Sequence, residues 1–209
     1  MKIAQIAPLF ESVPPRLYGG TERVVSYLTE ALVADGHEVT LFASGDSLTS
    51  ARLVACSTEA LRLNPQIRDP LPWQAIQLEQ LRRRADEFDV IHFHIDLIQF
   101  PLLDLFAGRA LTTLHGRLDL PDLMPFYSLF HDSPLVSISD AQRLPMPPVN
   151  WLGTVPHGLP ADLLQFRPEG LGGYLAFLGR ISPEKRPDRA IEIAERTGLP
   201  LKIAAKVDK

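Results

Sequence analysis

The sequence predicts an α/β fold: a Rossmann-like parallel sheet with helices on both faces, followed by a truncated second α/β domain. Short apolar runs alternate with longer amphipathic segments, as in parallel strands joined by helices. The length of 209 residues suffices for one α/β domain and part of a second. A loop rich in proline and glycine over residues 161–173 separates the two, which indicates a linker.

The first predicted elements are a buried strand over residues 2–7, a loop over residues 8–20 and a helix from Thr21. Apolar residues recur at helical spacing after Thr21, which is the predicted N-cap, and Gly36 is the predicted C-cap. Further strands are predicted at residues 37–43, 53–56, 89–94, 110–114, 135–138 and 153–155. Further helices are predicted at residues 73–88, 97–106 and 124–130.

We assign residues 1-165 to the amino-terminal Rossmann-like domain and residues 171-209 to the second. The second contains a strand at residues 174–178, a helix at 183–197 and a strand at 201–205, which make one βαβ unit. Such a unit leaves its sheet edges and the apolar helix face uncovered. We therefore expect residues 170–209 to be poorly ordered or to pack against another copy of the chain.

Composition excludes several function classes. The chain is 45% hydrophobic and 22% charged, as soluble globular proteins are, and its net charge of -4 favours neither nucleic acid nor an anionic membrane. No apolar run approaches the ~20 residues of a spanning helix, so a cytoplasmic protein is expected. Cys56 has no second cysteine to form a disulfide with. The run Arg82-Arg83-Arg84 is interpreted as a solvated helix face, or else as a patch for a peripheral membrane or an anionic acceptor.

Gly19 and Gly20 lie between the first strand and the first helix. Glycines allow a ligand to approach the backbone, and a helix amino end offers unpaired N–H groups to an anion, so the turn is a candidate phosphate site. The dinucleotide motif G-x-G-x-x-G and the Walker motif are both absent. The alternative is a purely structural turn.

Arg180 and Lys185 flank a second strand-to-helix turn. Ser182 can cap the helix predicted from Pro183, so both cations are expected near a helix amino end. Two cations there are unfavourable for the helix dipole unless an anion binds. The alternative is a solvated turn.

Several histidines follow or end strands. His92 and His94 point to one face because they are two residues apart on a strand, but no third metal ligand is evident, so no metal site is predicted. His94 and the turn at His157-Gly158 are expected to line a cleft. Ser139 and Asp140 lack the G-x-S-x-G elbow of hydrolases.

Five segments together resemble the retaining GT-B glycosyltransferases of family 4. They are GGTE (19–22), LHG (114–116), VSISDAQR (136–143), VPHGLP (155–160) and LGRISPEKRPDRAIEIA (178–194). The resemblance implies a GT-B amino-terminal lobe and the start of the second lobe. It also implies that Gly19, Gly20, Arg180 and Lys185 bind the donor diphosphate and that His115 is the catalytic residue that contacts the transferred sugar. Glu22 is expected to anchor the glycine loop, and Glu22, His94, Ser139, His157 and Gly158 to line the cleft.

The predicted function is transfer of a sugar, with retention, from a nucleoside-diphosphate donor to an unknown acceptor hydroxyl, without a cofactor or metal. The resemblance implies front-face transfer in which the departing phosphate helps to deprotonate the acceptor. The acidic E-x-x-x-x-x-x-E segment of the family is absent, so these residues alone are expected to have little or no activity. The alternative is a non-catalytic Rossmann-like domain that binds an acceptor or a partner. A sugar-nucleotide epimerase of the same two-lobed fold is disfavoured by the motif set.

Overall fold

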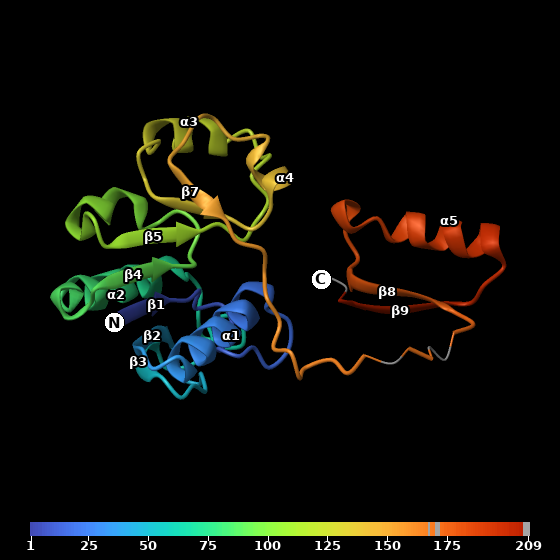
Figure 1. Ribbon diagram of the computed structural model, residues 1–209, viewed down its shortest axis with the longest axis horizontal. Helices are drawn as coiled ribbons and strands as arrows, with labels where there is room; N and C mark the ends of the chain where they lie inside the picture. The colour runs from blue at the N-terminus through green and yellow to red at the C-terminus, as the bar shows by residue number, and fades with distance from the viewer. Residues whose placement is uncertain (167, 170–171, 207–209) are drawn as a thin grey trace. The chain divides into compact units, whose positions relative to one another are not determined.

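The computed structural model describes residues 1–166, 168–169 and 172–206. These residues form two compact units, Met1–Leu163 and a second that begins at Leu164 (Figure 1). Positions 167, 170 and 171 of the predicted linker and positions 207–209 lie outside the described residues.

The first unit is built on one seven-stranded sheet in the order β3-β2-β1-β4-β5-β6-β7. Every adjacent pair is parallel. The Rossmann-like sheet predicted from the sequence is therefore confirmed. The strands are β1 (Lys2–Ile6), β2 (Glu38–Ser44), β3 (Arg52–Ser57), β4 (Val90–Phe93), β5 (Ala110–Thr113), β6 (Leu135–Ser137) and β7 (Trp151–Thr154).

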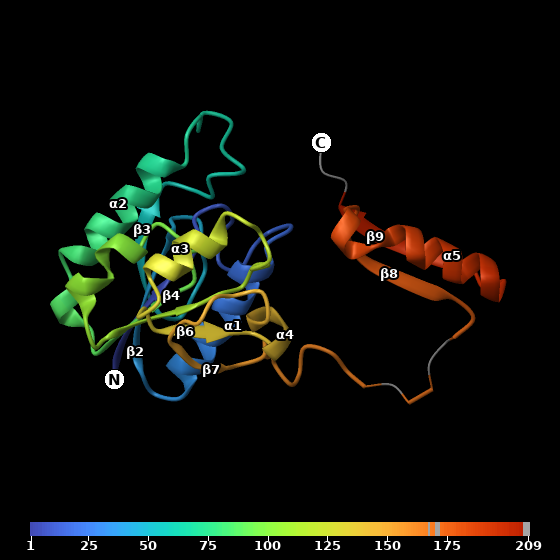
Figure 2. The ribbon, with the colours of Figure 1, turned by 90° about the horizontal axis from the view of Figure 1, so that it is seen from above.

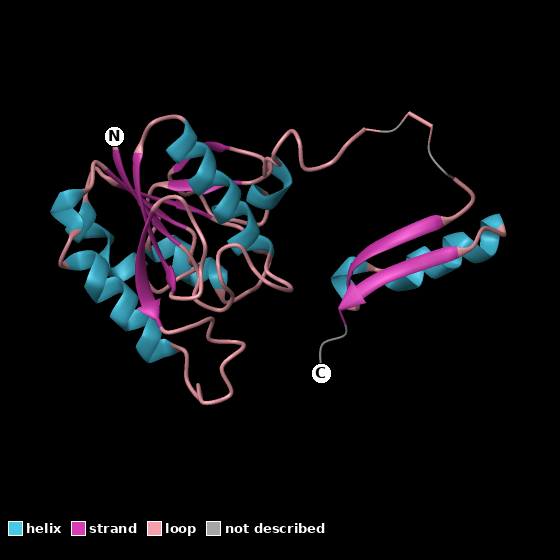
Figure 3. Cartoon of the chain, turned by 90° about the horizontal axis from the view of Figure 1, so that it is seen from below, coloured by secondary structure: helices cyan, strands magenta, loops and turns pink. Residues whose placement is uncertain are grey.

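Helices cover both faces of this sheet (Figures 2 and 3). Leu41 packs with Val25 on one face, whereas its neighbour Phe42 packs with Leu78 and Leu81 on the other, as expected when side chains alternate along a strand. The helices are α1 (Gly20–Ala34), α2 (Leu71–Arg82), η1 (Ala85–Glu87), η2 (Phe100–Phe106), α3 (Leu123–Leu129) and α4 (Asp140–Arg143), where η denotes a 3-10 helix.

The two faces of the sheet differ in what they bury. The large apolar core lies on the α2 face, and the α1 face has only a small core around Val25 and Leu41. Gln5 is in register with Leu41 on β2 and with His92 on β4, so it shares the α1 face with both. Gln5 and His92 are thus adjacent polar side chains on this face, between Leu41 on β2 and Leu111 on β5.

Some predicted boundaries in the first unit are wrong for identifiable reasons. The N-cap of α1 is Gly19, in an extended conformation, and not Thr21. Helix α2 begins at Leu71 because Pro72 is tolerated in a first turn, and it ends at Arg82 before a separate 3-10 turn. The predicted helix over 97–106 is a 3-10 helix from Phe100. The short helix α4 was not predicted from the sequence.

The second unit contains the parallel pair β8 (Leu175–Arg180) and β9 (Leu201–Lys206) and the helix α5 (Pro187–Thr197). The helix predicted over 183–197 is wrong in its first turn, which is the separate 3-10 turn η3 (Pro183–Lys185). Arg186 interrupts it in a left-handed conformation, φ 53°. Proline disfavours the right-handed helical conformation in the residue before it, so Pro187 restarts the helix. Ser182 makes no side-chain capping bond.

Candidate functional site

Four histidines gather at the carboxyl end of the sheet of the first unit. His92 lies on β4 and His94 directly after it, while His115 follows β5 and His157 follows β7. The carboxyl ends of parallel strands share one edge, and ligands of open α/β sheets bind there. The strand topology therefore collects histidines that are far apart in the sequence.

Hydrogen bonds join three of these rings into a chain. His94 Nδ1 lies 2.9 Å from His115 Nε2, and His115 Nδ1 lies 2.9 Å from His157 Nε2. The buried end continues to Gln5, whose Oε1 lies 2.6 Å from His94 Nε2. His92 stands beside the chain with its ring centroid 4.0 Å from that of His94, and its Nε2 lies 2.7 Å from Thr113 Oγ1.

The surroundings keep these imidazoles neutral. Burial lowers the pKa of His92 to about 4. Burial, with smaller contributions from His157 and His92, lowers the pKa of His115 to about 3. Burial also takes the pKa of His94 well below its ordinary value, and the partial burial of the His157 ring at the surface lowers the pKa of His157. Each ring therefore has one N–H donor and one lone pair at neutral pH.

Gln142 holds the turn on which His115 lies. Its Nε2 donates to the carbonyls of Leu114 (2.9 Å) and Gly116 (2.7 Å), the residues on either side of His115. Its Oε1 accepts from the Ile138 N–H at 2.9 Å. Ser139 Oγ accepts from the Gln142 N–H at 3.1 Å and so caps α4. The predicted cleft residue Ser139 thus has a capping bond that positions Gln142.

A cavity of about 930 Å³ opens beside the histidines, between α1 and the sheet. Its walls are mostly apolar, and the polar groups of its floor are the imidazoles and Thr113. Gly158 and the residues around His157 border it. Among the residues that the structure describes, no group of three or more His, Cys, Asp or Glu side chains is arranged to hold a metal ion.

The glycine turn at the start of α1 is tightly packed at one glycine and open at the other. A Cβ on Gly19 would lie 2.8 Å from Glu22 Oε2 and 2.8 Å from Pro15 Cβ, whereas a Cβ on Gly20 would meet nothing within 4 Å. The N-cap residue Gly19 offers no side-chain hydrogen bond to the first N–H groups of α1. The open backbone at Gly20 keeps this turn a candidate anion site.

Two acidic side chains are buried under this turn. Glu11 pairs with Arg62 at 2.7 Å, and Arg62 also donates to the Tyr18 carbonyl at 3.3 Å. Burial raises the pKa of Glu22, an effect that a hydrogen bond from its own backbone N–H and the nearby Arg62 partly offset. The ion pair and the buried carboxyl of Glu22 fix the loop over residues 11–19 to the body of the unit.

In the second unit, Arg180 ends β8 and Lys185 ends the 3-10 turn η3. Arg180 Nη2 lies 3.1 Å from Glu184 Oε1, in a pair whose side chains are both more than a third exposed. A Cβ on Gly179 would lie 3.9 Å from Lys185 Cγ, so the turn brings the lysine stem back to the end of the strand. The two cations lie at a strand-to-turn junction, not at the amino end of α5 as predicted.

The arginine run predicted as a solvated face is paired within its own helical segment. Arg82 and Arg83 each lie 2.7 Å from a Glu79 oxygen, and Arg84 lies 2.8 Å from Glu87. No helix among the described residues is long and apolar enough to span a membrane.

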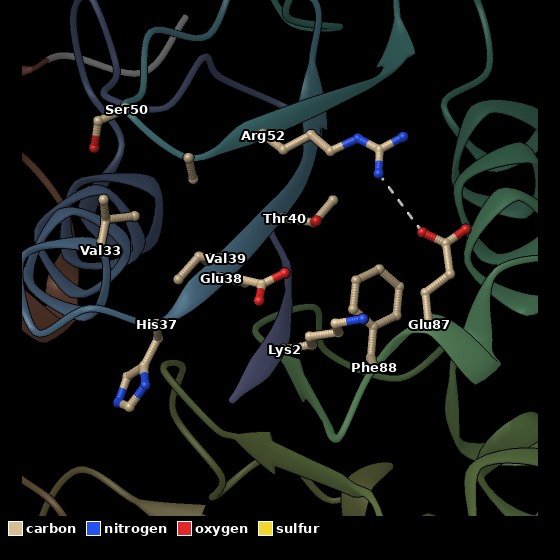
Figure 4. A pocket seen from close by; sticks show the side chains of 11 residues that line it. Lys2, Val33, His37, Glu38, Val39, Thr40, Ser50, Arg52, Glu87 and Phe88 are labelled. Atoms are coloured by element: carbon tan, nitrogen blue, oxygen red, sulfur yellow. Dashed lines mark ion pairs between the residues drawn. The ribbon is translucent and has the colours of Figure 1, made fainter.

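A second cavity, of about 450 Å³, lies at the amino ends of β1 and β2 (Figure 4). Arg52 and Glu87 approach to 3.7 Å across it. This is the end of a parallel sheet opposite to the one where ligands bind, so the histidine edge is the better candidate.

Sequence reasoning found His94, His115 and His157 but missed the two glutamines that hold them. Gln5 is fully buried in a strand that is otherwise apolar apart from Lys2 at its exposed end. A lone amide inside such a strand is the signal that could have identified it, because a buried amide must be hydrogen-bonded. Gln142 carries no comparable signal in the sequence.

Comparisons with known proteins agree with this architecture. No match was found among curated proteins. Among solved structures, AviGT4, a glycosyltransferase involved in avilamycin A biosynthesis, has 20% identity and a TM-score of 0.55 over 100% of this chain. Sucrose-phosphate synthase from Thermosynechococcus elongatus has 13% identity and a TM-score of 0.56 over 99% of this chain. A glycosyltransferase from Rickettsia africae has 15% identity and a TM-score of 0.54 over 98%.

These similarities establish the fold and show what share of each related structure the chain covers. The chain covers 64% of AviGT4, 71% of the synthase and 68% of the Rickettsia protein. The family profile of Glycosyltransferase Family 4 matches residues 18–147, more than half of the chain, and this stretch includes the glycine turn, His94, His115 and Gln142. The chain therefore belongs to glycosyltransferase family 4.

Proposed function

We propose that this protein transfers a sugar, with retention, from a nucleoside-diphosphate donor to an acceptor hydroxyl. The observation that carries the proposal is the position of His115. It lies within the family match, at the carboxyl end of the parallel sheet and beside the large cavity of the first unit. A polar group at that edge, next to an apolar wall, suits a ligand with both hydroxyl groups and apolar faces, as a sugar ring has.

The roles proposed within the first unit follow from its contacts. His115 is proposed to contact the transferred sugar, with His94 behind it and His157 and Gly158 at the cavity border. Gly19 and Gly20 are proposed to approach the donor diphosphate through the uncapped start of α1. Glu22 is proposed to anchor that turn, because its buried carboxyl leaves no room for a side chain at position 19.

The roles proposed within the second unit are electrostatic. Arg180 and Lys185 are proposed to bind the diphosphate, whose negative charge grows as the glycosidic bond breaks. The exposed pair between Arg180 and Glu184 contributes little free energy, so a phosphate can compete for the guanidinium. We propose that neither a metal nor a cofactor takes part and that the departing phosphate helps to deprotonate the acceptor.

We propose that these 209 residues alone turn over donor slowly or not at all. The chain covers 64% of AviGT4, and the acidic segment that completes the family's donor site is missing from it. We also propose that the second unit self-associates, because it exposes apolar side chains on both its helix and its strands, at Ile191, Ile193, Leu178 and Ile203.

Nucleotide binding tests the donor assignment without requiring turnover. Calorimetric titration with UDP, GDP and ADP is expected to detect binding of one of them. Arg180→Ala and Lys185→Ala are each expected to weaken it ~10-fold or more, since a hydrogen bond to a charged group contributes about 1.5–3 kcal/mol. Arg189→Ala, an exposed arginine on α5, is the matched control. Equal affinity of all variants, or no binding of any nucleotide, would contradict the proposal.

A further inference from the structure

The hydrogen-bonded histidines have a direction that one buried residue can set. From the interior outward, the order is Gln5, His94, His115 and His157. Gln5 and His94 are buried, His115 is half-buried and His157 is exposed. This row of hydrogen bonds thus runs from a buried amide in the interior to an imidazole ring at the surface.

A neutral imidazole has one N–H and one lone pair. In a row of hydrogen-bonded imidazoles, the donor in one bond therefore fixes the donor in the next. Gln5 Oε1 can only accept, and therefore Nε2 of His94 carries the hydrogen. Nδ1 of His94 then has only a lone pair, so Nε2 of His115 must donate to it. By the same step Nδ1 of His115 accepts from Nε2 of His157.

The two ends of the hydrogen-bonded row differ in how strictly they fix which atom of each bond is the donor. His157 is at the surface, where water can donate or accept equally well. Gln5 lies in the middle of β1, between Ala4 and Ile6, whose side chains belong to the apolar core of the opposite face. Its carbonyl faces His94, and its Nε2 has no hydrogen-bond partner in the described part of the chain. The interior end is therefore the one that can impose a polarity.

We propose that Gln5 is a positioning residue that sets the tautomer of His115 through His94, placing the hydrogen of all three rings on Nε2. The proposal rests on the proposed function only in taking His115 as the ring that faces the sugar. With these tautomers, Nδ1 of His115 has a lone pair that accepts the hydrogen bond from Nε2 of His157. A ligand hydroxyl that reaches Nδ1 must displace His157 and must donate its own hydrogen.

Tautomers are observable directly by NMR. In the 209-residue chain labelled with ¹⁵N-histidine, long-range ¹H–¹⁵N correlation at neutral pH distinguishes a protonated from a bare ring nitrogen. Single His→Gln variants assign the six histidines. The expected result is hydrogen on Nε2 of His94, His115 and His157. Hydrogen on Nδ1 of these rings, or a mixture in the unmodified chain, would overturn the proposal.

Two variants of Gln5 separate its polarity from its shape. Gln5→Met keeps the approximate volume but removes the strong acceptor, and is expected to shift the tautomers of His94 and His115 away from Nε2–H. Gln5→Glu keeps an acceptor and is expected to retain the Nε2–H register. His37 and His131 are not part of the hydrogen-bonded row of histidines. They serve as internal references, and their tautomers are expected not to change. An unchanged tautomer at His115 in Gln5→Met would show that Gln5 does not set it.

The measurement on the unmodified chain remains decisive even where Gln5→Met does not fold. The readout requires neither donor nor turnover, so it stands apart from the test of the transferase assignment. Nucleotide binding with the wrong tautomers would refute the role of Gln5 alone. The correct tautomers without nucleotide binding would refute the proposed function alone.

Discussion

His94 Nδ1 and His115 Nε2 form a hydrogen bond of 2.9 Å between two rings 21 residues apart, one after β4 and the other after β5. With His157 on its other nitrogen, His115 has both ring nitrogens engaged by protein groups. A sugar hydroxyl can therefore reach a ring nitrogen of His115 only by replacing one of these partners. The exposed His157 is the partner that can leave, because His94 is buried.

Stability is expected to fall as the pH drops below 6.5. The folded pKa values of about 4 for His92 and about 3 for His115 lie below the ordinary 6.5, so the unfolded chain binds protons first on acidification. Below pH 6.5, each such histidine lowers the free energy of unfolding by up to ~1.4 kcal/mol per pH unit, until the pH reaches its folded pKa. Above pH 6.5 these groups contribute no pH dependence. Urea unfolding from pH 7.5 downward measures the effect.

The matched variants for this pH dependence are His115→Asn and His131→Gln. The first removes a buried imidazole and is expected to flatten the curve, and the second removes an exposed one and is expected to leave its slope unchanged. Curves of equal slope in all three proteins would show that the histidine chain takes up protons in the folded state.

Gln142→Ala is expected to destabilise the first unit by about 1.5–4.5 kcal/mol. It removes three hydrogen bonds, to the carbonyls of Leu114 and Gly116 and from the Ile138 N–H, each contributing about 0.5–1.5 kcal/mol. Amide exchange at Ile138 is expected to accelerate. Gln66→Ala, at an exposed glutamine, is the control. Unchanged exchange at Ile138 would show that Gln142 does not hold the His115 turn.

The sheet and its histidines could be predicted because they follow from local patterns. Spacing of two residues on a strand places His92 and His94 on one face, and the turn at His157 is expected near a cleft. His115 is placed at that cleft by the family resemblance. Which rings bond to which could not be predicted, since the pairing of Gln5 with His94 depends on the register of β1 against β4 over 89 residues.

The second unit was mispredicted at its turn for a local reason that the sequence does contain. The helix is predicted to start at Pro183 because Ser182 suits an N-cap and proline suits a first helical position. A residue before proline avoids the helical conformation, however, and Arg186 precedes Pro187. The turn therefore separates Arg180 and Lys185 from the amino end of α5. The helix dipole is therefore not a valid reason for expecting an anion at this turn. The remaining reason is the positive charge of Arg180 and Lys185.

Self-association through the second unit predicts a concentration-dependent sedimentation coefficient. Leu178 is 87% exposed on β8, and Leu178→Gln is expected to shift the chain toward monomer by removing apolar area from the proposed contact. Leu164→Gln, which changes another exposed leucine outside the β8–β9 pair, is the control. A chain that stays monomeric at all concentrations would contradict the proposed self-association.

Alanine substitutions at the two adjacent glycines are expected to have opposite consequences. A Cβ at position 19 would lie 2.8 Å from the Glu22 carboxylate and from Pro15 Cβ, so Gly19→Ala must displace the loop and is expected to cost about 1–3 kcal/mol. At position 20 a Cβ meets nothing within 4 Å, so Gly20→Ala is expected to be neutral or to stabilise by up to ~1 kcal/mol through the unfolded state.

Urea unfolding of the two variants beside the unmodified chain checks this difference. Because the substitutions are chemically identical and adjacent, a common effect on the unfolded state cancels between them. What remains is the packing of the turn against Glu22 and Pro15, which positions the amino end of α1. Equal free energies of unfolding for Gly19→Ala and Gly20→Ala would mean that the turn is loose, and the glycine at position 19 would then need another explanation.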